Sequence, residues 1–133
     1  MPKNFQTLDT NILLSIILND EPSQRPKSVA LILNGANYYV PTLAITEAVF
    51  VMERGRRIDR KDIVTAISTL LDNSVLSYDR ELIDVVFPFY ISHPKLSFND
   101  CIIAFEAAKY ERGPVWTFDK EFAKQSAVAQ LIQ

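Results

Sequence analysis

Four acidic residues occupy positions from which their carboxylates could bind a divalent metal ion. Asp9 directly follows the segment FQTL and Asp119 directly follows VWTF. Both segments have the character of β-strands, and VWTF is expected to be a buried one. Asp100 lies in the first turn of a helix predicted to begin at Ser97, and Glu47 lies inside another predicted helix. Ligands of open α/β sheets bind beside the carboxyl ends of the strands, so acids at such positions are candidates for a functional site.

Each acid taken singly also has a structural explanation. Asp9 and Asp119 are plausible helix N-caps, and Ser97 is followed three residues later by an acid, as in a capping box. Asp9, Thr10 and Asn11 could all cap the same helix. Since one cap is enough and Thr10 or Asn11 could provide it, the carboxylate of Asp9 still needs an explanation.

Glu47 differs from the other acids because its helical neighbours at three and four residues' distance are apolar. These neighbours are Leu43, Ala44, Phe50 and Val51. Burying an unpaired carboxylate on such a face costs free energy or raises its pKa, so a metal ion, a cation or water in a cleft is expected beside it. The alternatives are a glutamate solvated at a helix edge, or one neutralised by an arginine of ERGRRIDRK.

Considered together, the four acids indicate a metal site. If they converge within a few ångströms, each close pair repels by up to about 4 kcal/mol at an effective dielectric constant of roughly 20, and a bound cation offsets that repulsion. Oxygen ligands favour Mg²⁺ or Mn²⁺. One histidine and one distant cysteine are too few for the nitrogen and sulfur ligands of a usual zinc site.

The order of predicted elements places these residues on a parallel sheet. Strands are expected at about 5–8, 37–41, 74–78, 115–118 and the C-terminal end, and helices at about 11–18, 28–35, 42–54, 62–73, 80–87, 97–110 and in the tail. Pro88 is expected to kink or end its helix. Strands separated by helices require crossover connections, so the predicted fold is α/β, a parallel-sheet three-layer α/β/α sandwich, formed by residues 1–133 as a single domain.

Composition and charge narrow the classes of function. A content of 48% hydrophobic residues in 133 suffices for a core, and the single cysteine, Cys101, suggests a buried thiol in a reducing compartment. Neither a signal peptide nor an apolar run long enough to span a membrane is present, so a cytoplasmic protein is expected. The net charge of −2 excludes a general electrostatic binder of nucleic acid, so any such role must come from a local patch.

Four motifs give the chain a resemblance to a known family. LDTNILL, TEAVFVMER, LSFNDCIIAFEA and WTFDKEF occur in this order across almost the whole chain. In order and approximate spacing they resemble the motifs of the PIN-domain nucleases, most closely the VapC-like toxins. Each motif alone arises often by chance, but four acidic motifs in register across one small α/β chain make a distinctive pattern.

The resemblance implies a set of site residues and an activity. The implied metal-binding acids are Asp9, Glu47, Asp100 and Asp119, and the implied polar helpers are Asn11, Thr117 and, more weakly, Thr10. The family implies an endoribonuclease that depends on Mg²⁺ or Mn²⁺, acts as a homodimer and is inhibited by an antitoxin protein occupying its active-site groove. Such a metal ion can lower the pKa of a bound water and offset charge on the phosphate, so no histidine base is required, and His93 is expected at the surface.

A basic segment is a candidate for contacts with RNA. The run RGRRIDRK carries five cations that could hold phosphates beside an acidic metal site: Arg54, Arg56, Arg57, Arg60 and Lys61. The alternative is a solvated turn between helices, because basic residues are also favoured near helix C-termini.

Two other classes of function compete with a nuclease. A phosphoaspartyl enzyme would also place an aspartate after the first strand, but a phosphatase of that kind needs a second aspartate where this chain has Asn11. The other alternative is a catalytically silent PIN-like module that binds RNA or a protein. The presence of all four acids argues against such a module.

Overall fold

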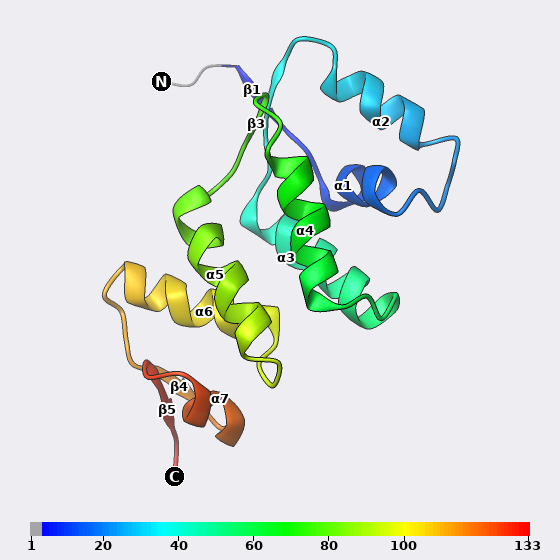
Figure 1. The fold of residues 1–133 in the computed structure, drawn as a ribbon. Coiled ribbons are helices and arrows are strands. Elements are labelled where there is room, and N and C mark those ends of the chain that lie inside the picture. The colour runs from blue at the N-terminus through cyan, green and yellow to red at the C-terminus, as the bar shows by residue number, and fades with distance from the viewer. Residues whose placement is uncertain (1–3) are drawn as a thin grey trace. The chain divides into compact units, whose positions relative to one another are not determined.

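The computed structural model of the chain describes residues 4–133 and divides into two compact units, one reaching to Asp79 and one running from Arg80 to Gln133. Both units combine helices with parallel strands (Figure 1), so the protein is a mixed α/β structure, as predicted. In the described residues no helix is both long enough and apolar enough to cross a lipid bilayer.

The described part of the first unit consists of a three-stranded parallel sheet and the helices that connect its strands. In chain order its elements are β1 (Phe5–Thr7), α1 (Thr10–Ile17), α2 (Arg25–Ile32), β2 (Asn37–Tyr39), α3 (Thr42–Phe50), the π-helical turn η1 (Val51–Gly55), α4 (Arg60–Leu71) and β3 (Leu76–Ser77). Parallel strands need crossover connections, and the helices between these strands provide them.

The sheet of the first unit places its strand ends at a common edge. β2 is the middle strand, and Tyr38 pairs with Gln6 of β1 and with Leu76 of β3. Tyr38 is buried in this position, and its hydroxyl donates a hydrogen bond to the Leu31 carbonyl oxygen at 2.9 Å. Because β1 and β2 run in parallel, the helices α1 and α3 both begin at the carboxyl edge of the sheet.

Helix α1 is the element around which the other helices of the first unit gather. It packs against α2, α3 and α4 (Figure 1) and buries Leu13 in the core. From α4, the residues Ile63, Ile67 and Leu71 are buried at four-residue intervals, as expected for one apolar face of a helix. The positions of the side chains at the start of α1 are therefore determined by a well-packed helix.

The second unit consists of a helix pair and a small parallel sheet. Its described elements are α5 (Arg80–Ser92), α6 (Phe98–Lys109), β4 (Val115–Thr117), α7 (Lys120–Gln125) and β5 (Ala129–Leu131). α5 packs along α6, where the ring of Phe98 contacts the rings of Phe87 and Tyr90 at centroid distances of 5.7 and 5.2 Å. α7 packs against both β4 and β5.

Most predicted elements are confirmed, with shifted boundaries. α2 begins at Arg25, earlier than the predicted residue 28, because Pro26 fits the first turn of a helix, where its missing N–H is not needed. Gly35 follows the end of that helix with φ of +91°, a conformation that favours glycine. The N-cap position of α3 is Pro41, and the predicted helix 42–54 is α3 followed by η1.

Pro88 was predicted to kink or end its helix, and the second of these alternatives is wrong. α5 continues through Pro88 to Ser92, although the proline has no N–H to donate. Pro88 lies on the exposed side of the helix, whereas its neighbours Phe87 and Tyr90 are buried. The burial of these aromatic rings outweighs the lost backbone hydrogen bond.

The segment VWTF was predicted as a buried strand, and only its strand character is confirmed. β4 pairs with β5 in the described residues, but Trp116 is 60% exposed and Phe118 is 78% exposed. The physical reason is that β4 belongs to a two-stranded sheet in which α7 covers part of the surface.

The cap of α6 gives a stability prediction. The Ser97 hydroxyl accepts a hydrogen bond from the Asp100 backbone N–H at 3.0 Å, so Ser97→Ala should lower the free energy of unfolding by about 1 kcal/mol. Urea denaturation followed by circular dichroism would measure the change. The matched control is Ser68→Ala on the exposed surface of α4, which should cost nothing because alanine favours a helix. Equal stability of both variants would contradict the role of Ser97.

Candidate functional site

Asp9 lies at the carboxyl end of β1 and caps α1. The Leu8 N–H donates to the Tyr39 carbonyl oxygen at 3.0 Å, which extends the pairing of β1 with β2 up to the residue before Asp9. The Oδ1 atom of Asp9 accepts a hydrogen bond from the Ile12 N–H at 3.3 Å. Within the described residues Oδ2 accepts no hydrogen bond, and the side chain is exposed. The prediction that Asp9 is an N-cap is therefore confirmed, but the cap occupies only one of the two carboxylate oxygens.

Glu47 of α3 is joined to Thr10 at the start of α1. The Thr10 hydroxyl donates to Oε1 of Glu47 at 2.7 Å and lies 3.5 Å from the Ala44 carbonyl oxygen. A hydroxyl has one proton, and the shorter contact with the carboxylate is the stronger one. This bond joins residues 37 positions apart and brings Glu47 of α3 next to Thr10, the residue that follows Asp9.

The argument for Glu47 from burial is wrong. Glu47 is exposed, and so are its helical neighbours Leu43 (69%) and Phe50 (58%), whereas Ala44 is buried. Glu47 therefore pays no large desolvation cost, and its position agrees with the alternative of a glutamate solvated at a helix edge. Its role as a metal ligand stays a prediction that rests on the resemblance to the PIN-domain nucleases.

Asp119 repeats the arrangement of Asp9 in the second unit. It follows the end of β4 and caps α7, where Oδ1 accepts hydrogen bonds from the N–H groups of Glu121 at 2.8 Å and Phe122 at 3.1 Å. The Thr117 hydroxyl accepts a hydrogen bond from the Asp119 N–H at 2.9 Å and so fixes the backbone at the cap. As in Asp9, Oδ2 has no hydrogen-bond donor among the described residues.

Asp100 lies in the first turn of α6 and is held there by the cap at Ser97. Its side chain is partly buried, and neither of its oxygens accepts a hydrogen bond from a described residue. Negative charge in the first turn of a helix is favoured by the helix dipole, which makes this an acceptable place for an ionised carboxylate.

The four predicted acids are divided equally between the two units. The first unit holds Asp9 and Glu47 with Thr10 and Asn11, and the second unit holds the other residues of the set, namely Asp100, Asp119 and Thr117. Among the described residues no group of three His, Cys, Asp or Glu side chains forms a metal site. The chemistry of the donors nevertheless suits Mg²⁺ or Mn²⁺, because each carboxylate retains an oxygen that no described donor occupies.

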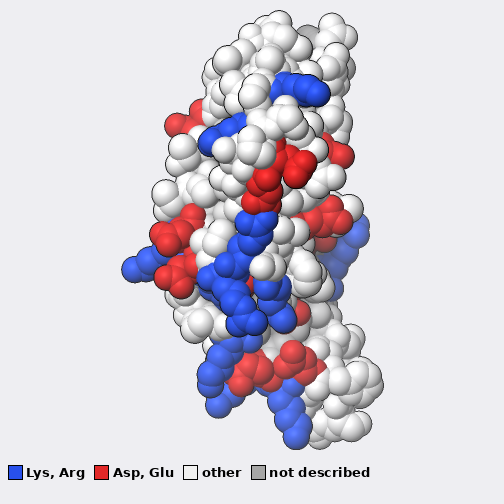
Figure 2. Space-filling view, turned by 90° about the vertical axis from the view of Figure 1, so that its right-hand side faces the viewer, with Lys and Arg blue, Asp and Glu red and all other residues white. Residues whose placement is uncertain are grey.

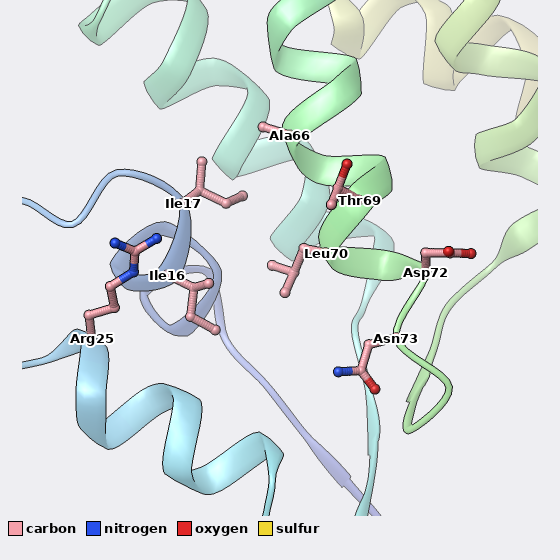
Figure 3. A pocket seen from close by; sticks show the side chains of 8 residues that line it. All are labelled: Ile16, Ile17, Arg25, Ala66, Thr69, Leu70, Asp72 and Asn73. Carbon is pink, nitrogen blue, oxygen red and sulfur yellow. The ribbon is translucent and has the colours of Figure 1, made fainter.

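Two hollows flank α1 in the first unit. One, of about 300 Å³, lies beside Asp9 and is lined by Asp9, Asn11, Ile12, Ser15, Gln24, Lys27 and Ser28. The other, of about 610 Å³, is lined by Ile16, Ile17, Arg25, Ala66, Thr69, Leu70, Asp72 and Asn73. Figure 3 shows the second hollow, with the Arg25 guanidinium and the Asp72 carboxylate on opposite sides of its apolar residues. The polar residues of the smaller hollow lie next to a predicted metal ligand.

The predicted basic segment is partly neutralised by acids. Arg56 forms an ion pair with Asp20, and the Arg60 Nε lies 3.0 Å from Oε2 of Glu53. Arg54, Arg57 and Lys61 are exposed. Figure 2 shows a face of the protein on which Lys and Arg side chains gather with acidic side chains among them. The segment is therefore a local cluster of cations on a protein whose net charge is slightly negative.

The side chains of His93 and Cys101 pack within the second unit. The His93 ring is partly buried and stacks on Phe89 at a centroid distance of 3.7 Å, and its Nδ1 lies 3.0 Å from the Phe89 carbonyl oxygen. Cys101 is buried in α6, as predicted. Neither residue adds a group to the predicted acidic site.

The sequence did not indicate the polar wall beside Asp9. Ser15 lies four residues after Asn11, a helical spacing that could have placed both on one side of α1. Gln24, Lys27 and Ser28 carry no such signal, because their place depends on how α2 packs against α1. The part that Thr10 plays was also underestimated, since its partner Glu47 is distant in the sequence.

Comparison with known proteins identifies the family. The PIN domain family matches residues 7–128, which include all four acids and extend over both units, so the chain belongs to the PIN domain family. The chain is 26% identical over 126 residues to a VapC ribonuclease of Aquifex aeolicus (strain VF5), a match that covers 90% of this chain and 91% of that protein. No solved structure gives a significant match.

The two oxygens of Asp9 give a prediction that separates the cap from metal binding. Asp9→Asn should leave the free energy of unfolding in EDTA within about 0.5 kcal/mol of wild type, because asparagine caps helices as well as aspartate. Asp9→Ala should lower it by about 0.5–2 kcal/mol. Added Mg²⁺ or Mn²⁺ should stabilise the wild type by about 1.4 kcal/mol for each tenfold excess over Kd, and both variants far less. Thermal melts across a metal titration would measure this.

Asp59→Asn is the matched control for this titration. Asp59 also occupies a helix N-cap position, at α4, but its side chain makes no capping hydrogen bond. Its variant should respond to the metal as the wild type does. If Asp9→Asn responds as strongly as Asp59→Asn, Asp9 is a cap and not a metal ligand.

Proposed function

We propose that the protein is a metal-dependent endoribonuclease that hydrolyses RNA phosphodiester bonds and acts as the toxin of a type II toxin–antitoxin pair. The observation that carries the proposal is that the capping aspartates keep one carboxylate oxygen without a hydrogen bond from the described residues. Asp9 and Asp119 each use one oxygen to cap a helix at the carboxyl end of a strand and keep the other oxygen available. Membership of the PIN domain family and the similarity to a VapC ribonuclease support the choice of RNA as substrate.

In this proposal residues 1–133 act as a single domain, in which Asp9, Glu47, Asp100 and Asp119 hold Mg²⁺ or Mn²⁺. The metal would supply a water of lowered pKa and offset negative charge on the phosphate. All four acids fall within the family match to residues 7–128, which supports assigning them to one function.

The surrounding residues would orient the carboxylates. Thr10 holds one oxygen of Glu47, Thr117 holds the backbone of Asp119, and Asn11 lies beside Asp9 in the smaller hollow. Groups that orient metal ligands commonly affect metal affinity by about 10- to 100-fold. Arg54, Arg57 and Lys61 are proposed to contact RNA phosphates, with Arg56 and Arg60 held by their acidic partners.

The proposed partners are a second copy of the chain and a cognate antitoxin protein, in the cytoplasm. Several large apolar side chains are more than half exposed, among them Leu33, Leu43, Phe50, Trp116 and Phe118. Exposed apolar residues in this number favour association with another protein surface. The alternative of a catalytically silent RNA- or protein-binding module makes the opposite prediction for cleavage.

Cleavage of RNA should require both the metal and the acids. The purified protein should cleave single-stranded RNA in Mg²⁺ or Mn²⁺ and stop when EDTA is added, and Asp100→Asn should reduce the rate by at least about 100-fold, because the amide keeps the shape but loses the charge. Gel analysis of labelled RNA would measure it. Asp84→Asn, an exposed acid on α5, should cleave as the wild type does.

Two results would reject this function. Equal cleavage in EDTA would exclude a metal-dependent mechanism. Binding of RNA without any cleavage in either metal would favour the silent module.

The proposed homodimer predicts a particle of twice the chain mass. Light scattering at micromolar concentration should give about twice the 15.1 kDa of one chain, because pairing of two copies would remove exposed apolar surface from water. Replacing Phe50 by Ser should shift the protein towards the monomer if α3 takes part, whereas Val29→Ser on α2 serves as a control of lower exposure. A persistent monomer of the wild type would contradict the dimer.

A further inference from the structure

The smaller hollow beside Asp9 combines a cation with polar side chains that have no protein partners. Asn11 comes from α1, Gln24 is at the N-cap position of α2, and Lys27 is in its first turn. In the part of the chain that the structure describes, these three side chains form no hydrogen bond or ion pair. They are therefore available to a ligand that enters the hollow.

A pair of buried hydroxyls fixes this wall in place. Ser15 of α1 and Ser28 of α2 are both buried, and their hydroxyl oxygens lie 2.7 Å apart. Ser15 donates its one proton to the Ile12 carbonyl oxygen at 2.7 Å, so Ser28 must be the donor to Ser15. This bond ties the first turns of α2 to α1 and sets Lys27 on the same hollow as Asp9.

Stability of α2 does not explain a lysine at this position. Positive charge in the first turn of a helix is disfavoured by the helix dipole, and no acid of the described residues pairs with Lys27. Gln24 also contributes no side-chain cap to the helix. The charge of Lys27 is unfavourable for its own helix, and Lys27 lines a hollow beside Asp9. A negatively charged molecule bound in the hollow explains this lysine better than helix stability does.

Size and composition of the hollow indicate which ligand it suits. About 300 Å³ is at the lower end of the range of roughly 300–1,000 Å³ for small-molecule sites, which suits one nucleotide better than a longer stretch of strand. Lysine binds a phosphate as a point charge. The side-chain amides of Asn11 and Gln24 both donate and accept hydrogen bonds. No aromatic residue lines the hollow, so base stacking does not contribute.

We propose that Lys27, with Gln24 and Asn11, forms a subsite for one nucleotide of single-stranded RNA beside Asp9, and that Lys27 binds its phosphate. This inference rests on the proposed function, since the subsite serves the ribonuclease site. A phosphate contact carries no sequence information, so the subsite strengthens binding to RNA of any sequence.

The test compares two cations of the same helix. Lys27→Gln and Arg25→Gln remove one positive charge each, but Arg25 lines the other hollow (Figure 3). Binding of a fluorescein-labelled single-stranded RNA of mixed sequence is followed by anisotropy in EDTA across a salt series. KM and kcat for cleavage of the same RNA are measured in Mg²⁺. Thermal melts verify that both variants are folded, which is expected because both side chains are exposed.

Lys27→Gln should weaken RNA binding and raise KM by about fivefold to tenfold at ~0.15 M salt with little change in kcat, and it should lower the slope of log K against log salt by about 0.7. Lys27→Arg should restore both quantities because it keeps the charge. Arg25→Gln should change affinity by less than about twofold.

The outcomes separate this inference from the proposed function. If the wild type cleaves RNA and the two glutamine variants have the same KM and salt slope, the subsite is wrong and the ribonuclease stands. If the wild type binds RNA in a Lys27-dependent way without cleaving it, the subsite stands and the ribonuclease is wrong. If Lys27→Gln changes only the affinity for Mg²⁺, or if the wild type neither binds nor cleaves RNA, the subsite is overturned.

Discussion

The positions of the predicted site residues depend on one interaction. It is the hydrogen bond between an aspartate at the end of a strand and the backbone N–H groups of the helix that follows it. In Asp9 and Asp119 this bond engages Oδ1 and fixes the side chain against the start of α1 or α7. A carboxylate has two oxygens with about four acceptor positions, so a cap does not exhaust it. The cap thereby fixes each carboxylate at the carboxyl end of its strand and leaves Oδ2 without a hydrogen bond from the described residues.

This dual use explains how a small chain can hold acids ready for a cation and remain stable. Ionised carboxylates at helix starts are favoured by the helix dipole, which makes negative charge acceptable there. Thr10 adds a charge-assisted hydrogen bond to Glu47, and Thr117 fixes the backbone of Asp119. The same local bonds that stabilise the fold therefore prepare the groups on which the proposed metal site depends.

Cations complement the acids, in keeping with a polyanionic substrate. The net charge of −2 is too small in magnitude to repel RNA strongly, and the basic residues are concentrated in the segment around η1 and in the first turn of α2. Arg56 and Arg60 are engaged by acids, whereas Lys27 faces a hollow and has no such partner. In the proposed enzyme, contacts with phosphates would come from the cations that the fold leaves unpaired.

The sequence by itself determined the alternation of strands and helices and the caps at three helix starts, because capping and hydrophobic periodicity act within a few residues. It predicted Asp9, Asp119 and Ser97 at helix starts, and the structure confirms them. Only the tertiary structure decided that α5 continues through Pro88, that Glu47 is exposed and bonded to Thr10, and that Lys27 lies beside Asp9. These features depend on packing between elements distant in the chain, whose energies outweigh local propensity and leave no periodic trace in the sequence.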